Sequence, residues 1–185
     1  TDTTVTYYYV RKAAGDVTIH HYEENSTTEL ATTVVQSGAN KLGLAYTTNE
    51  ETINNYELVA QPANKNGTFT VAAQTVDYYY RRKNAGNITV KYLETGTNTQ
   101  LHADKILDGT KKLGLPYSES AETIANFDLD TTNLPTNDNG VYTTAPITIT
   151  YYYKRKDAGN VVAKYLEDTT NTVLATEETQ NGAGK

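Results

Sequence analysis

Three tyrosine triplets contain the side chains best suited to contact a ligand, and they begin at residues 7, 78 and 151. An exposed tyrosine ring can cover the apolar face of a sugar while its hydroxyl forms a hydrogen bond. Because side chains alternate along a strand, Val76, Tyr78 and Tyr80 share a core face, and the middle tyrosine of each triplet faces solvent. The alternative is that the middle tyrosines pack against a neighbouring module. The candidate ligand contacts from the triplets are Tyr8, Tyr79 and Tyr152.

A basic cluster follows each triplet. The clusters are Arg11-Lys12, Arg81-Arg82-Lys83 and Lys154-Arg155-Lys156, and they hold half of the 16 lysine and arginine residues in a chain whose net charge is −6. These cations could bind the carboxylate or sulfate groups of acidic glycans. The alternative is a solvated strand end that is partly paired with nearby acids such as Glu94. The candidate ligand contacts from the clusters are Arg81, Arg82, Lys83, Lys154, Arg155 and Lys156.

Residue patterns typical of catalysis or metal binding are sparse. The chain has no cysteine, and no nucleophile–base pair or two-carboxylate site recurs along it, so we predict that it is not an enzyme. His20 and His21 are adjacent on a predicted strand and face opposite sides, so they cannot share one ion. Residues 137–140 faintly resemble a calcium loop, but the matching residues 64–67 carry a lysine where a carboxylate is needed. We predict no cofactor, with a structural cation such as calcium at an acidic module junction as the alternative.

The composition favours a secreted or surface-exposed, mostly-β protein. The 185 residues include 16 tyrosines and two phenylalanines; tyrosine and threonine favour strands, and asparagine favours turns. The acidic balance argues against nucleic acid as a partner, and the lack of any run of 18 apolar residues argues against membrane insertion. Since the chain has no methionine, we expect it to be a piece of a longer polypeptide.

The sequence repeats itself with a period of about 70 residues. Besides the triplets and basic clusters, the matched positions are Leu42-Gly43-Leu44 with Leu113-Gly114-Leu115, Tyr46 with Tyr117, Tyr56 with Phe127, Pro62 with Pro135, and Gly67 with Gly140. The second copy has two more positions at residues 130–134 than the first has at 59–61. A unit of this size is small for an independent core, so we expect successive units to support one another end to end.

We therefore divide the chain into two complete and two partial units. Residues 1–12 are predicted to be the closing strand of a preceding unit, packed on the first module, which covers 13–83. The second module covers 84–156. Residues 157–185 are predicted to be the opening hairpin of a truncated third unit, packed on the second module. Adjacent repeats of the same polypeptide are thus predicted partners.

Within one unit, the sequence pattern predicts mainly short strands. Strands are predicted at residues 88–94, 101–107, 127–129 and 147–154 from period-2 alternation and flanking turn signals. The polar stretch 118–126, with serines able to cap it, is predicted to be one short helix. Asn139-Gly140 is typical of a turn. The order β-β-α-β-β indicates an α+β, mostly-β module like the β-grasp, arranged in tandem as an elongated rod.

These residues resemble the mucin-binding (MucBP, or Mub) repeat of cell-wall-anchored adhesins from Gram-positive bacteria. The resemblance rests on Ala-Gly-Asn-Ile-Thr-Val-Lys-Tyr-Leu-Glu at 85–94, Tyr117, Asn139-Gly140 and the Ile-Thr-Tyr-Tyr-Tyr ending at 149–153. It implies a ubiquitin-like β-grasp element, extracellular display on the cell wall surface with an anchor outside this fragment, and adhesion to mucus glycoproteins. His20 and His21 depart from Lys91 and Tyr92 of the second copy, so the first copy could bind differently.

Three functions are therefore open. The leading hypothesis is a repeat fragment of a surface adhesin that holds host mucin glycoproteins through the glycans, by multivalent weak contacts. The second is binding of immunoglobulin or another host protein at an exposed edge of the β-grasp sheet. The third is a structural spacer of a cell-wall stalk that binds neither.

Overall fold

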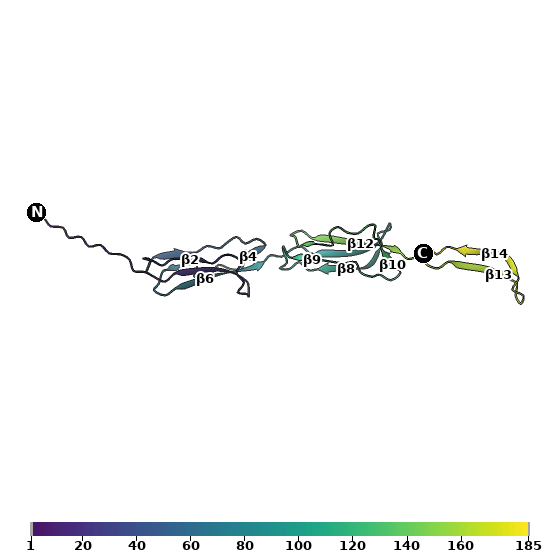
Figure 1. Cartoon of the computed structure of the whole chain (residues 1–185), viewed down its shortest axis with the longest axis horizontal. Helices are drawn as coiled ribbons and strands as arrows, with labels where there is room; N and C mark the ends of the chain where they lie inside the picture. The colour runs from purple at the N-terminus through teal and green to yellow at the C-terminus, as the bar shows by residue number, and fades with distance from the viewer. Residues whose placement is uncertain (1, 185) are drawn as a thin grey trace. The chain divides into compact units, whose positions relative to one another are not determined.

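The computed structural model describes residues 2–184 and divides them into two compact units (Figure 1). The first unit contains residues 2–84 with Lys111–Leu113, and the second contains Ala85–Thr110 and residues 114–184. All regular elements in these residues are strands. None of residues 2–184 forms a helix long and apolar enough to cross a membrane. The mostly-β tandem fold predicted from the sequence is therefore confirmed.

The first unit is built on a four-stranded sheet in the order β2-β1-β6-β4. Its strands are β1 (Val17–Glu23), β2 (Val34–Gln36), β4 (Tyr56–Leu58) and β6 (Gln74–Arg82). The two long strands, β1 and β6, pair in parallel at the centre, with Ile19 opposite Val76 and His21 opposite Tyr78. A second ladder joins β3 (Ala45–Thr47) to β5 (Asn66–Thr68). Opening and closing strands of one repeat thus share one sheet.

The second unit repeats this arrangement with the order β10-β12-β7-β8. Its strands are β7 (Ile88–Glu94), β8 (Gln100–Leu107), β10 (Phe127–Leu129) and β12 (Ile147–Arg155), with a separate ladder of β9 (Pro116–Ser118) and β11 (Asn139–Val141). The parallel central pair is β7 with β12. The strands predicted from the period-2 pattern all occur. A further hairpin pairs β13 (Val161–Leu166) with β14 (Val173–Gln180) (Figure 1).

Each unit has its own core, made by alternate residues of the two central strands. The first core contains Val17, Ile19, Tyr46, Phe69, Val76, Tyr78 and Tyr80, and the second contains Ile88, Val90, Tyr92, Tyr142, Ile149, Tyr151 and Tyr153. The outer two tyrosines of each triplet in β6 and β12 are buried, whereas Tyr79 is 43% exposed. The predicted alternation of core and solvent faces is confirmed for these two triplets.

The helix predicted at 118–126 is wrong. Ser118 ends β9, and no helix follows it in the described chain. In place of helical hydrogen bonds, the Tyr153 hydroxyl donates to the Glu122 carbonyl at 2.8 Å, and the Glu51 amide of the first unit donates to the Tyr80 hydroxyl at 2.9 Å. Buried tyrosine hydroxyls therefore satisfy the backbone of an irregular crossing segment, which the capping serines alone could not indicate.

The turn predicted at Asn139-Gly140 is also wrong, because both residues lie in β11. Gly140 pairs with Tyr117 across the ladder. A Cβ atom at Gly140 would lie 3.1 Å from the Tyr117 hydroxyl oxygen, and one at the matching Gly67 would lie 2.7 Å from that of Tyr46. Glycine occurs here because a tyrosine ring lies against the strand, not because the chain turns.

The packing predicted for the two partial units is not observed. Residues 2–16 contain no strand, and Val5, Tyr7, Tyr8, Tyr9 and Val10 are largely exposed. The hairpin of β13 and β14 is exposed along its whole length. The sheet topology accounts for this exposure: a closing strand pairs with the opening strand of its own repeat, and residues 2–184 hold no opening strand for the first triplet and no closing strand for the hairpin. The division of the chain into two complete and two partial units stays a prediction.

Candidate functional site

The candidate site of the first unit surrounds Tyr79 on the solvent face of the sheet. Tyr79 lies opposite Tyr22 in the parallel ladder, with ring centroids 6.0 Å apart. One hollow beside it, the turn-side hollow, has a volume of about 830 Å³ and is lined by Glu24, Asn25, Ser26, Thr27, Val59 and Tyr79. A second, the Pro62 groove, has about 380 Å³ and is lined by Val59, Ala60, Gln61, Pro62, Asn64, Thr75, Asp77 and Tyr79. The two share Tyr79 and Val59.

The second unit has a matching groove beside Tyr152. This Pro135 groove has about 280 Å³ and is lined by Asn133, Leu134, Pro135, Thr136, Asn137, Thr148, Thr150 and Tyr152. Its wall is fixed as in the first unit: the Asn137 side-chain amide donates to the Thr148 carbonyl at 2.9 Å, and that of Asn64 to the Thr75 carbonyl at 2.8 Å. The same bonds from side chain to backbone therefore position a proline-containing loop beside a tyrosine of the solvent face, which is exposed in the first unit and partly buried in the second.

The two sites differ at the position after β4 and β10. Val59 and Asp130 are equivalent there, since the amide of each donates to the carbonyl of the solvent-face tyrosine, Tyr79 and Tyr152 respectively. Val59 is partly exposed and lines both first-unit hollows, whereas Asp130 is buried.

Asp130 is held by a dense set of donors. Its carboxylate accepts hydrogen bonds from the hydroxyls of Thr95 (3.0 Å) and Thr132 (2.6 Å) and forms an ion pair with Lys154 at 2.8 Å. These donors, Lys154 foremost, hold the pKa of Asp130 well below its usual range. The network occupies the second unit at the place where the first unit has the turn-side hollow.

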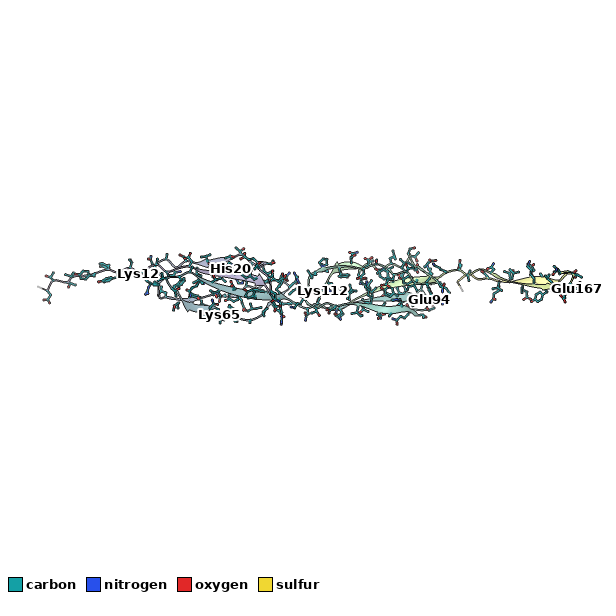
Figure 2. The ribbon with its side chains drawn as sticks, turned by 90° about the horizontal axis from the view of Figure 1, so that it is seen from below. Lys12, His20, Lys65, Glu94, Lys112 and Glu167 are labelled. Atoms are coloured by element: carbon teal, nitrogen blue, oxygen red, sulfur yellow. The ribbon has the colours of Figure 1, made fainter. Side chains whose placement is uncertain are left out.

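Acidic and aromatic side chains surround Tyr79 on the first-unit sheet. His20 (Figure 2) lies on β1 opposite Asp77, and its Nδ1 lies 2.8 Å from the Glu29 carboxylate and 3.1 Å from the Thr33 hydroxyl. Hydrogen bonds from Thr33 and His20 lower the pKa of Glu29. Burial, together with Glu29 and Asp77, raises the pKa of Tyr22. Asp77 has no such donor on one oxygen: its Oδ1 is buried without a hydrogen-bond partner.

The structure separates the predicted tyrosines. Tyr79 and Tyr152 line the grooves, as a solvent-facing position requires. Tyr8 is 93% exposed and lies in a stretch without a strand. The grooves thus bring two of the three predicted tyrosines into equivalent sites, and ligand contact by any of them stays a prediction.

Most of the predicted basic residues are engaged by groups of their own unit. Three of them form ion pairs with a nearby acid: Arg81 with Glu57 at 2.7 Å, Lys156 with Asp128 at 3.5 Å, and Lys154 with Asp130. Arg155 pairs with Glu94 (Figure 2) at 3.3 Å and also stacks on the Phe127 ring. Arg82 stacks on the Tyr56 ring, donates to its hydroxyl at 2.6 Å, and donates to the Leu113 carbonyl at 3.0 Å. The Lys83 amide donates to the Asn55 carbonyl. The side-chain charges of these residues other than Lys83 are thus engaged near strand ends, whereas the contact given for Lys83 is made by its backbone. The role of all six as ligand contacts stays a prediction.

Sequence reasoning did not identify Asp77 and the loop residues that line the grooves. Strand alternation puts Asp77 on the same face as Tyr79, and the repeat matches Pro62 with Pro135. Only the fold brings that loop against the sheet. Among residues 2–184 no group of three histidine, aspartate or glutamate side chains could hold a metal ion. The predicted lack of a cofactor, with a structural cation as the alternative, stays a prediction.

Two tandem mostly-β units with the same sheet order define a repeat protein. Residues 16–81 and 87–154 match the MucBP domain, so the chain belongs to the MucBP domain family. The family resemblance seen in the sequence is thereby confirmed.

Internalin J of Listeria monocytogenes serovar 1/2a is 33% identical over 188 residues, which cover 98% of this chain and 21% of that protein. Internalin J of Listeria monocytogenes serotype 4b is 35% identical over 171 residues, which cover 90% of this chain and 18% of that protein. The chain thus spans about a fifth of the length of these curated relatives.

Two solved structures also resemble the chain. Domains 3–4 of the Streptococcal High Identity Repeats in Tandem from a cell surface protein align with a TM-score of 0.39 and 11% identity, over 78% of this chain and 99% of that one. Mub-RV aligns with a TM-score of 0.30 and 12% identity, over 77% of this chain and 99% of that one.

Proposed function

We propose that these repeats bind host mucus glycoproteins outside the bacterial cell, through many weak contacts with their glycans. The observation that carries the proposal is the recurrence of one tyrosine-lined groove in both units, beside Tyr79 and Tyr152. We take the chain to act by contact and not by catalysis, as part of a polypeptide displayed on the cell wall surface.

The groove chemistry suits a sugar. A tyrosine face covers the apolar C–H groups of a sugar ring, and the amides and hydroxyls around it supply hydrogen-bonding groups in fixed positions. Each groove is shallow and small, so one contact is weak. Linked grooves raise the effective concentration of each further contact, so affinity grows with the number of repeats.

The direct test measures binding of the whole chain to immobilised mucin. Replacing both groove tyrosines (Tyr79→Ala with Tyr152→Ala) should weaken binding about tenfold or more, since an aromatic anchor is commonly a large contributor. The matched control is Tyr165→Ala, because Tyr165 is as exposed as Tyr79, at 43%, but lies in the β13–β14 hairpin. Equal loss in the control, or no loss in the double variant, would contradict the proposal.

The contribution of repetition is tested by joining two copies of the chain in one polypeptide. We expect the joined chain to bind mucin at least about a hundredfold more tightly than the single chain. Equal affinity would argue against multivalent binding. Loss of mucin binding with retained binding of immunoglobulin would select the sheet-edge alternative, and no binding of either would select a spacer.

A further inference from the structure

We infer that the first unit binds the neutral end of a saccharide in the Pro62 groove, with Asp77 accepting hydrogen bonds from adjacent sugar hydroxyls and Tyr79 covering the ring. The second unit holds the same sugar more weakly. This inference rests on the proposed function and names its ligand class and its principal site.

The first step concerns Asp77. It lies on β6 two residues before Tyr79, so both side chains project from the same face of the strand. Both line the Pro62 groove. The buried Oδ1 of Asp77 has no donor among residues 2–184. A buried acceptor without a donor is unfavourable. Because Oδ1 is closed off from solvent in the unbound chain, a sugar hydroxyl can bond to it only when the Asp77 side chain turns toward the groove that it lines.

The second step concerns charge. Asp77 is the one charged side chain among the described residues that line the Pro62 groove. Lys65, in the same loop, contacts the Gln61 side-chain oxygen at 3.4 Å. Glu24 in the neighbouring hollow pairs with Lys111 at 3.1 Å. An acidic sugar would place its carboxylate beside an unpaired carboxylate, whereas a neutral sugar offers only hydroxyls to it.

The third step concerns the shape of the site. Tyr79 and Val59 border both the Pro62 groove and the turn-side hollow, so a sugar ring on Tyr79 has open space on either side for the residues linked to it. The groove volume lies at the lower end of the range for small-ligand sites. Gln61 on the groove wall is held in place, since its side-chain nitrogen donates to the Glu50 carboxylate and its side-chain oxygen accepts from Lys65.

The fourth step is the contrast with the second unit. Thr150 lies in the Pro135 groove at the position equivalent to Asp77. A neutral hydroxyl accepts weaker hydrogen bonds than a carboxylate. Asp130 and its donors Thr95 and Lys154 also occupy the place of the turn-side hollow. The second groove keeps the aromatic contact but lacks the charge-assisted acceptor.

The test titrates the whole chain with lactose and with 3′-sialyllactose, measured by NMR chemical shifts. We expect lactose to bind with a preference of about fivefold or more over its sialylated form. The variant Asp77→Thr, which introduces the second unit's residue, should weaken lactose binding about tenfold. The reciprocal variant Thr150→Asp should strengthen binding at Tyr152. An unchanged thermal midpoint for Asp77→Thr would show that the fold is intact.

The outcomes separate this inference from the proposed function. Preference for sialyllactose, or unchanged lactose affinity in Asp77→Thr, would overturn the inference while leaving mucin binding in place. Unchanged mucin binding in the double variant with Tyr79→Ala and Tyr152→Ala would overturn the proposed function itself. Lactose shifts at the Pro62 groove that Asp77→Thr removes would support the inference.

Discussion

The two units have the same sheet but differ beside the solvent-face tyrosine. The register of β1 with β6 is repeated by β7 with β12, and both cores are built from the outer tyrosines of a triplet. At the position after the third sheet strand, however, Val59 lines an open hollow, whereas the buried Asp130 carboxylate pairs with the half-exposed Lys154. The buried residues therefore determine the fold, and the residues on the solvent face differ between the two units.

A second difference lies inside the core. The Tyr92 hydroxyl of the second unit donates to the Glu122 carboxylate at 3.1 Å. The equivalent His21 is buried, stacks on Tyr78 with centroids 5.2 Å apart, and lies 3.0 Å from the Tyr80 hydroxyl. A hollow of about 140 Å³ remains beside His21 and reaches Glu51. The imidazole ring of His21 is shorter than the phenol ring of Tyr92, so it leaves space in the first unit that tyrosine fills in the second.

The largest predicted effect separates the two faces of one triplet. Tyr78→Ala should cost about 3–5 kcal/mol of the unfolding free energy, because it opens a cavity in the first core and removes the 2.8 Å hydrogen bond with Thr48. Tyr79→Ala should change it by less than about 0.5 kcal/mol. Calorimetry checks both. Because the two cores share no residue, only the first unit's transition should shift in Tyr78→Ala; equal shifts of two transitions would contradict separate cores.

A smaller loss is expected from opening the network of the second unit. Asp130→Val introduces the first unit's residue and leaves Thr95, Thr132 and Lys154 without their acceptor. The second unit's midpoint should fall by less than in a core variant. The lowered pKa of Asp130 means that its contribution is present above about pH 4 and is lost as the pH falls further. The difference between Asp130→Val and the parent chain should therefore shrink in strong acid; a constant difference would exclude the charged network.

A gain in stability, rather than a loss, is expected for His21→Tyr. This variant makes the first unit resemble the second. Filling the hollow should stabilise the first unit by about 1 kcal/mol, a rise of about 4–8 °C in its midpoint. The neighbouring hollow accommodates the longer ring, as the position of Tyr92 indicates.

The same variant should alter the pH dependence of the first unit. Burial lowers the pKa of His21, opposed by Glu51 and Glu29 and reinforced by His20. The unfolded chain then binds the proton more tightly, so the parent loses stability as the pH falls below about 6.5. His21→Tyr should remove that loss between about pH 6.5 and 5. Identical pH profiles for the two proteins would contradict a buried, neutral His21.

The smallest effect concerns the basic clusters. Arg81 and Glu57 are each about half exposed, and such pairs contribute about 0–1 kcal/mol. Arg81→Gln should therefore change the unfolding free energy by less than about 0.5 kcal/mol, and mucin binding should stay within about twofold of the parent chain. A large loss of binding would move the ligand contact from the grooves to the basic strand ends.

The sequence predicted the elements that depend on local pattern. The alternation around Val76, Tyr78 and Tyr80 and in the predicted strand 147–154 indicated the central strands β6 and β12, their buried tyrosines and the exposed Tyr79. The crossing segment could not be predicted in this way, since its backbone is satisfied by hydroxyls of Tyr80 and Tyr153 from distant strands. The position of Gly140 inside a strand could not be predicted either, because the Tyr117 ring that requires glycine there lies on another strand.

The candidate site could be predicted only in part. Alternation identified Tyr79 and placed Asp77 beside it, but the loop of Pro62 and Asn64 reaches that face only through the fold. The difference between Val59 and Asp130 lies next to the two added positions at 130–134, where the alignment alone shows an insertion and not a filled hollow.

The most direct test of this account maps lactose binding on the isotope-labelled whole chain by NMR. We predict that amide shifts concentrate on residues around Thr75, Asp77 and Tyr79, with smaller shifts around Thr150 and Tyr152. Shifts confined to the basic residues 81–83 and 154–156, or spread evenly over the two units, would contradict it.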